Sequence, residues 1–218
     1  MALKLAVLIS GTGSNLAAIQ SAIAARRCDA EIVLVLSDRP AAGLAFAREH
    51  GIRSEIVNPR DFTDRARWDD AIAETIGSAQ PDLVVSAGFM RVLGAAPVVR
   101  FAGRMINIHP ALLPLFPGTR GPELAIEAGM RISGCTVHVV EAGVDTGPIV
   151  AQAAVPIRPD DDAATLHARI QRAEHVLLPR VIDAIARGEI ALNPKLRHRM
   201  SFDASDMFLS PSFRDGSA

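Results

Sequence analysis

Residues 3–9 form an apolar run, LKLAVLI, interrupted only by Lys4 and followed at once by the glycine loop Ser10–Asn15. A run without polar alternation is typical of a strand buried on both faces, and such strands belong to parallel sheets covered by helices. After the loop, Leu16, Ile19 and Ile23 share one helical stripe. The sequence therefore predicts a strand, a glycine loop and a helix, in that order.

Strands and helices keep alternating beyond this unit, with further strands predicted at 31–37, 53–57, 83–86 and 104–108, and helices at 41–50 and 62–78. This alternation predicts an α/β fold with a Rossmann-like, doubly wound, mostly parallel sheet. Two β-rich runs, 134–140 and 149–155, indicate an added C-terminal β-hairpin. Asp160–Asp162 then precede a long C-terminal helix, since acids favour a first helical turn.

The glycine loop lies where a strand passes into a helix, a layout that points free backbone N–H groups at an anion. It is not a dinucleotide fingerprint, because Leu16 fills the third glycine position, and it lacks the lysine of a Walker A loop. It predicts a phosphate site, although a tight turn that requires glycine would look the same. Asp38, after the second strand, is placed to bind a ribose as in dinucleotide enzymes, but the adjacent Arg39-Pro40 favours a helix-capping or turn carboxylate.

Asn107 and His109 end the predicted fifth strand, and residues two apart on a strand point to the same face. Pro110 holds His109 in an extended conformation. An amide beside an imidazole can stabilise a developing oxyanion and move a proton. The alternative is a strand-end histidine whose hydrogen bond is simply satisfied.

Two carboxylates have ambiguous positions. Asp145 lies at the glycine-flanked tip of the predicted hairpin, where a carboxylate is usually only solvated. Glu174 lies on the apolar stripe of the long helix, between Ile170 and Leu177. Because carboxylates are rarely buried without a partner, Glu174 either lies at the edge of that stripe or binds a polar ligand. The apolar loop 87–93 suits a flat aromatic ligand, although core packing has a similar composition.

Composition narrows the class of protein. The 218 residues suffice for a full core, and a net charge of -1 provides no basic surface for nucleic acid. No apolar run reaches the length of a membrane span, so no membrane partner is expected. The two cysteines provide no disulfide framework, which favours a reducing compartment. We expect a cytoplasmic protein without a bound metal, either a monomer or a homodimer.

Five ordered motifs resemble the phosphoribosylglycinamide formyltransferases, a folate-dependent formyltransferase family of de novo purine biosynthesis. The resemblance covers roughly residues 3–190. The motifs are SGTGSNL (10–16), AGFMR (87–91), NIHPALLP (107–114), DTGPI (145–149) and QRAEH (171–175). The asparagine, histidine and aspartate of the family's site fall on Asn107, His109 and Asp145.

The resemblance implies transfer of the formyl group of 10-formyltetrahydrofolate, a co-substrate, to the amine of glycinamide ribonucleotide. It implies a nucleotide site made by Gly13, Ser14, Asn15, Gln171, Arg172, Ala173 and Glu174, with Glu174 on the ribose hydroxyls. The pterin would lie against the Met90–Leu93 loop (Met90, Arg91, Val92, Leu93), Asn107 and the hairpin tip (Glu141, Ala142, Gly143, Val144, Asp145). Arg65 would lie near the folate tail.

One departure concerns the acceptor. Family members usually carry a histidine shortly after the Phe-Pro-Gly turn, where this chain has Pro122, and the preceding Arg120-Gly121 is similar to methionyl-tRNA formyltransferase. Another amine acceptor and a formyltetrahydrofolate deformylase therefore stay open. The short C-terminal end and the low positive charge weigh against the tRNA enzyme, and the lack of an N-terminal regulatory domain weighs against the deformylase.

Two readings from other classes stay open as well. A nucleotide-binding oxidoreductase would use Asp38 and the glycine loop, whereas a non-catalytic folate- or nucleotide-binding module would not need Asn107, His109 and Asp145 together. We expect one formyltransferase domain over 1–195, with a nucleotide-phosphate half (1–100) and a catalytic, folate-binding half (101–195). A loose tail is expected over 196–218.

Overall fold

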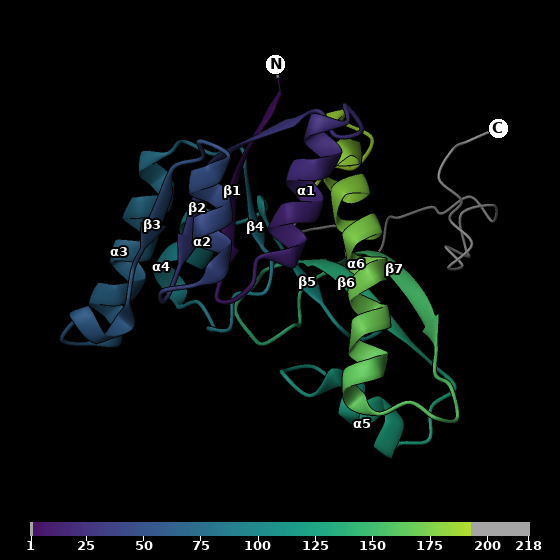
Figure 1. Ribbon diagram of the computed structural model, residues 1–218. Helices are drawn as coiled ribbons and strands as arrows, with labels where there is room; N and C mark the ends of the chain where they lie inside the picture. The colour runs from purple at the N-terminus through teal and green to yellow at the C-terminus, as the bar shows by residue number, and fades with distance from the viewer. Residues whose placement is uncertain (1, 193–218) are drawn as a thin grey trace.

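The computed structural model describes residues 2–192, which form one seven-stranded sheet covered by helices on both faces (Figure 1). The strand order is β3-β2-β1-β4-β5-β6-β7. The first five strands in this order run parallel, and β6 and β7 join as an antiparallel hairpin. The predicted fold class is confirmed. The predicted tail, 196–218, and the last residues of the predicted domain lie outside the described residues.

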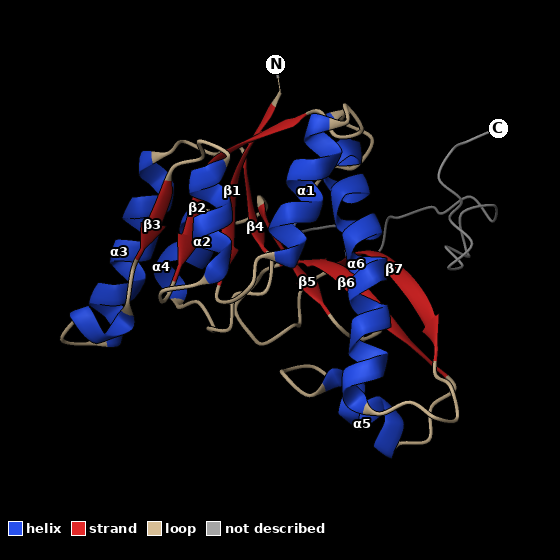
Figure 2. Cartoon of the chain, viewed as in Figure 1, coloured by secondary structure: helices blue, strands red, loops and turns tan. Residues whose placement is uncertain are grey.

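The strands follow the predicted runs closely (Figure 2). They are β1 (Leu3–Ile9), β2 (Ala30–Ser37), β3 (Ser54–Ile56), β4 (Leu83–Ser86), β5 (Met105–His109), β6 (Ile132–Val139) and β7 (Ile149–Pro156). β6 begins two residues before its predicted start and ends one residue before its predicted end, whereas β7 begins as predicted and ends one residue later. β5 is shifted by one residue from the predicted bounds 104–108, and His109 is its last residue.

The helices are α1 (Ser14–Ala24), α2 (Ala42–Glu49), α3 (Arg65–Ser78), α4 (Ala95–Arg100), α5 (Gly121–Glu127) and α6 (Ala163–Ala186), with a 3-10 turn, η1, at Pro59–Asp61. Asp162 caps α6 through the Thr165 backbone N–H, as the acidic run predicted. The short α4 was not predicted. None of the helices in residues 2–192 is long and apolar enough to cross a membrane.

Alternate side chains of β1 point to opposite faces and fill two separate cores. Leu5, Val7 and Ile9 pack with α1, α2 and α6 on one face. Ala6 and Leu8 pack against α3 on the other face, where Trp68 is almost fully buried. Burial on both faces explains why the strand is a continuous apolar run.

The carboxyl ends of the parallel strands meet along one edge of the sheet, and the register places particular residues side by side. Leu8 is paired with Ser86, Ser86 with Asn107, and Asn107 with His138 across the antiparallel junction. The crevice beyond such strand ends is where open α/β sheets bind ligands.

Candidate active site

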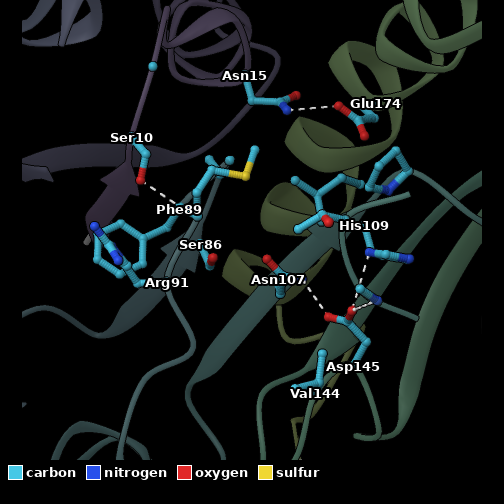
Figure 3. Close-up of a pocket in the computed structure, with 18 of the residues that line it drawn as sticks. Ser10, Asn15, Ser86, Phe89, Arg91, Asn107, His109, Val144, Asp145 and Glu174 are labelled. Atoms are coloured by element: carbon cyan, nitrogen blue, oxygen red, sulfur yellow. Dashed lines mark hydrogen bonds and ion pairs between the residues drawn. The ribbon is translucent and has the colours of Figure 1, made fainter. Parts of the chain in front are cut away.

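A cleft with a cavity volume of about 710 Å³ opens at this edge of the sheet (Figure 3). Its walls come from the glycine loop, the segment after β4, the end of β5, the β6–β7 connection and one side of α6. Segments from the first and last thirds of the chain therefore face one another across the same space.

Asn107, His109 and Asp145 lie together in this cleft, as the sequence predicted (Figure 3). Asp145 Oδ1 is 3.4 Å from Asn107 Nδ2, and Asp145 Oδ2 is 3.4 Å from His109 Nδ1. One carboxylate thus faces both the amide and the imidazole. This juxtaposition replaces the alternative of a merely solvated Asp145 at the hairpin tip.

Asp145 is held in place by its backbone as well as by its side chain. Its φ of 54° is left-handed, a conformation that Asp adopts more readily than most residues, and its Oδ2 accepts a 2.8 Å hydrogen bond from the Gly118 N–H. Partial burial raises the pKa of Asp145, but hydrogen bonds from His138 and Gly118 and the charges of His109 and His138 outweigh it. The net pKa is below the ordinary value. The carboxylate is therefore ionised at neutral pH.

His109 has a partner on each ring nitrogen. Its Nε2 lies 2.9 Å from the Phe116 carbonyl oxygen, which can only accept, so this nitrogen carries a proton. Its Nδ1 faces the Asp145 carboxylate. The protonated imidazolium satisfies both partners, so the site can present a positive charge to a developing oxyanion.

His138 is a site residue that the sequence interpretation missed. It is buried, its Nε2 is 3.1 Å from Asn107 Nδ2 and 3.4 Å from Asp145 Oδ1, and its Nδ1 is 3.0 Å from the Val139 carbonyl oxygen. The available signal was a histidine on a β-rich run expected to join the sheet near Asn107. Only the register of β5 and β6 shows that the two residues are opposite each other.

Two side-chain hydrogen bonds join the end of the glycine loop to α6. Ser14 Oγ accepts a 2.9 Å hydrogen bond from Gln171 Nε2, and Asn15 Nδ2 donates a 2.9 Å hydrogen bond to Glu174 Oε2. Glu174 is only 4% exposed, and burial raises its pKa although Asn15 and His167 act in the opposite direction. The predicted alternative, a carboxylate at the edge of the apolar stripe, is wrong: Glu174 is buried and bonded to Asn15.

Asn15 Oδ1 is a buried oxygen without a hydrogen-bond partner among the described residues. It belongs to a residue that lines the cleft beside Glu174. A buried acceptor without a partner is costly unless a ligand or water satisfies it. This wall of the cleft therefore offers both an acceptor and a carboxylate to the hydroxyl groups of a ligand.

An apolar rim lies on the other side of the cleft. Met90, Val92 and Val144 are 64%, 57% and 46% exposed, although their side chains are large and apolar. Behind them, Phe89 stacks against Trp68 at a ring-centroid distance of 6.5 Å. Exposed apolar side chains around a concave site are typical of a surface that binds a flat ligand.

Most of the predicted site residues line the cleft, but four do not. Arg172, Ala173 and Ala142 are absent from its walls, and Ala173 packs against the core instead. Arg65 lies behind the rim, where its guanidinium donates to the Val92 carbonyl oxygen and pairs with Asp69.

Asp38 lies behind the cleft and is not the N-cap of the helix that follows it. It is 1% exposed, does not line the cleft, and forms ion pairs with Arg39 at 2.7 Å and with Arg91 at 3.0 Å. The adjacent turn is capped by Ser37, whose Oγ donates to the Arg39 carbonyl oxygen at 2.7 Å. The prediction of a helix-capping carboxylate was wrong, because the N-cap of α2 is Ala41. Asp38 pairs with the adjacent Arg39, as a turn carboxylate can, and also with Arg91, 53 positions away.

Pro122 is buried, lines the cleft and lies in the first turn of α5. Arg120, which precedes that helix, is paired with Glu123 and Glu127. Residues 2–192 contain no group of three or more His, Cys, Asp or Glu side chains arranged to hold a metal ion.

A model of the formyl transferase family matches residues 3–182, and the chain belongs to this family. It is 46% identical over 183 residues to the phosphoribosylglycinamide formyltransferase of Mycobacterium tuberculosis H37Rv, covering 84% of this chain and 85% of that protein. The crystal structure of glycinamide ribonucleotide transformylase 1 from Symbiobacterium toebii superposes with a TM-score of 0.85 at 40% identity, covering 88% of this chain and 91% of that one. The resemblance inferred from the motifs is confirmed.

Some relatives are much longer than this chain. The trifunctional purine biosynthetic protein adenosine-3 of Drosophila melanogaster is 46% identical over 196 residues, covering 88% of this chain. The chain spans 14% of the length of that protein and 19% of its human counterpart.

Proposed function

We propose that this chain transfers the formyl group of 10-formyltetrahydrofolate to the primary amine of glycinamide ribonucleotide. The observation that carries the proposal is the meeting of Asn107, His109 and Asp145 between a closed glycine loop and an apolar rim. The names of the relatives that match most of their own length, those of Mycobacterium tuberculosis and Symbiobacterium toebii, support it.

The reaction is a direct attack of the amine nitrogen on the formyl carbon. A carbon–nitrogen bond forms, and the formyl oxygen becomes an oxyanion, which the Asn107 amide and the protonated His109 stabilise. A proton then passes from the amine nitrogen to N10 of the folate, and the bond between the formyl carbon and N10 breaks. Asp145, which faces His109 Nδ1, would orient the imidazole and order a water molecule for the proton transfer. Neither Cys28 nor Cys135 takes part, since both are buried and burial raises the pKa of both thiols.

The nucleotide is proposed to bind along the α1–α6 side of the cleft. The Gly13, Ser14 and Asn15 backbone N–H groups at the start of α1 would hold the phosphate, since that end of a helix attracts anions. Glu174, beside the unpartnered Asn15 Oδ1, would accept from the ribose hydroxyls, and Gln171 would fix Ser14. Arg172 and Ala173 would act only by holding their neighbours in register on α6.

The folate is proposed to bind at the opposite rim. The pterin would lie between the Met90–Leu93 loop and the hairpin tip, with Glu141, Gly143, Val144 and Asp145 on one side. Ala142 would contribute only backbone shape. Arg65 would stay near the folate tail, because its side chain is about half exposed beside the rim.

We propose further that the chain acts in the cytoplasm as a monomer or homodimer and that residues 1–195 form one domain with the two halves described above. The single sheet shared by both halves supports the domain assignment. Buried, unpaired thiols at Cys28 and Cys135 agree with a reducing compartment.

The test is a formyl-transfer assay with purified protein, 10-formyltetrahydrofolate and either glycinamide ribonucleotide or another amine as acceptor. The expected result is fast transfer to glycinamide ribonucleotide alone, lost in His109→Ala. Equal rates with other amines would indicate a different acceptor, and release of formate without transfer would indicate a deformylase.

A further inference from the structure

Asp38 is a buried charge that the proposed reaction does not use. Its side chain has no exposed surface, yet Arg39 and Arg91 both contact its carboxylate. Burial raises the pKa of Asp38, but hydrogen bonds from Arg39, Ser10 and Arg91 outweigh it and leave the net pKa below its ordinary value. The carboxylate is therefore ionised, and it sits between the end of β2 and the segment that follows β4.

That segment, the Met90–Leu93 loop, has neither helical nor strand hydrogen bonding to define its shape. Side chains of other elements hold it instead. The Met90 N–H donates to Ser10 Oγ at 2.8 Å, and Arg91 Nε donates to Asp38 Oδ2 at 3.0 Å. Beyond the loop, the Gly94 N–H donates to Asp69 Oδ1 at 3.0 Å. The loop is thus anchored at both ends while the apolar side chains of Met90 and Val92 stay exposed.

Ser10 and Asp38 act on the same end of the loop. The Ser10 hydroxyl hydrogen-bonds to Asp38, and Ser10 also accepts from Met90. In addition, the Ser10 N–H donates to the Gly88 carbonyl oxygen at 3.0 Å. Because a buried charge is costly without partners, the carboxylate favours the loop position in which Arg91 reaches it and Met90 reaches Ser10.

We propose that Asp38 is a positioning residue for the folate: through Arg91 and Ser10 it fixes the Met90–Leu93 loop in the shape that binds the pterin. Asp38 does not touch the cleft, so its effect on the folate passes through the loop. This inference rests on the proposed function for the identity of the ligand. In dinucleotide enzymes the acid at the end of the second strand binds ribose. In this chain the acid at that position would instead position a loop.

The two arginines provide a matched comparison. Their side chains are equally exposed, 45% for Arg39 and 46% for Arg91, and both contact Asp38. Only Arg91 belongs to the wall of the cleft. If Asp38 needed only charge neutralisation, Arg39, which forms three hydrogen bonds to the carboxylate, would matter at least as much as Arg91, which forms one. Loop positioning requires Arg91 alone.

The experiment compares Asp38→Asn, Arg91→Met and Arg39→Met in steady-state kinetics. Asp38→Asn is expected to raise the KM for 10-formyltetrahydrofolate about tenfold, equivalent to about 1.4 kcal/mol, and to change the KM for the ribonucleotide by less than about twofold. Arg91→Met should behave alike, Arg39→Met should stay near wild type, and the Asp38→Asn, Arg91→Met double variant should be no worse than the poorer single variant.

Equal effects of Arg39→Met and Arg91→Met, a parallel rise in both KM values, or additive effects in the double variant would each overturn the proposal. If Asp38→Asn fails to fold, the comparison of Arg91→Met with Arg39→Met still supports or overturns the proposal.

Calorimetric titration of tetrahydrofolate, without any acceptor, separates this inference from the proposed function. Suppose that wild type binds tetrahydrofolate, that Arg91→Met binds it more weakly, and that wild type does not formylate the ribonucleotide. This result would overturn the proposed function and support the loop role. If Arg91→Met binds tetrahydrofolate as tightly as wild type, the loop role is overturned.

Discussion

His138 lies directly across the β5–β6 ladder from Asn107, and its Nε2 is 3.1 Å from Asn107 Nδ2. The same nitrogen is 3.4 Å from Asp145 Oδ1. The amide that is proposed to stabilise the oxyanion is therefore oriented by a neighbouring strand. Because the sheet fixes the register of the two strands, it also fixes His138 beside the Asn107 amide.

Replacement of His138 by Ala should lower turnover because Asn107 and Asp145 lose a shared partner. We expect a fall in kcat of about tenfold, near the lower end of the range for a hydrogen bond to a charged group, with both KM values within about twofold of wild type. Steady-state kinetics measure both effects. His50→Ala, at an exposed histidine after α2, is the control and should leave kcat unchanged.

His109 and Asp145 should behave as one unit. Either single alanine substitution should lower kcat strongly with little change in substrate binding, because the interactions act mainly in the transition state. The double variant should be barely worse than the poorer single variant, since the carboxylate acts mainly through the imidazole. Independent, additive losses of kcat in this double-mutant cycle would show that the two side chains do not work together.

The ion pairing of Asp145 should make the free energy of unfolding depend on pH. Its pKa is lower in the folded state than the ordinary 3.8, so its contribution to the free energy of unfolding is present above that value and is lost as the pH falls through the folded pKa. Urea unfolding of wild type and Asp145→Asn should therefore show a constant difference from about pH 7 to about pH 5, and a shrinking one below about pH 4. A difference that does not vary with pH would contradict the ion pairing.

Glu174→Gln should separate binding from stability. Burial raises the pKa of Glu174, so its contribution to stability is fully present below the ordinary value of 4.5 and is lost as the pH rises through the folded pKa. At neutral pH the variant should be at least as stable as wild type. It should bind glycinamide ribonucleotide more weakly by about 1–3 kcal/mol, the range for hydrogen bonds to charged groups. Calorimetry of binding and thermal unfolding test the two parts, and lower stability with unchanged affinity would make Glu174 a structural residue.

Gly13 and Gly11 should differ in their tolerance of a side chain. A Cβ at Gly13 would lie 2.8 Å from Gly43 Cα, and its φ of 75° is unfavourable for alanine, whereas a Cβ at Gly11 would meet nothing within 4 Å. Gly13→Ala should therefore raise the KM for the ribonucleotide well above that of Gly11→Ala and lower the thermal midpoint as well. The KM for the folate should change little. If both substitutions affect the two substrates equally, the phosphate assignment fails.

The sequence predicted the structure correctly where the conformation depends on neighbouring residues alone. The shared face of Asn107 and His109 follows from strand geometry, and the glycine loop follows from its place between a strand and a helix. The helix α4 was missed because six residues with a central Pro97 carry little helical signal.

Residues that depend on distant partners could not be interpreted in the same way. The ion pair of Asp38 with Arg91 was not predicted because Arg91 lies far along the chain, and His138 was passed over because register is a property of the paired strands. Glu174 was recognised as unusual, but its hydrogen bond to Asn15 depends on how α6 packs against α1.

The two hydrogen bonds that close the glycine loop join residues 157 and 159 positions apart. During synthesis on the ribosome, the loop and α1 emerge long before α6, so the proposed nucleotide site cannot exist on a partly made chain. A nascent chain would therefore not sequester the nucleotide, and the site would appear only when translation has passed the residues of α6. The same separation means that a chain cut between β7 and α6 should regain the nucleotide site only by reassembly of its two fragments.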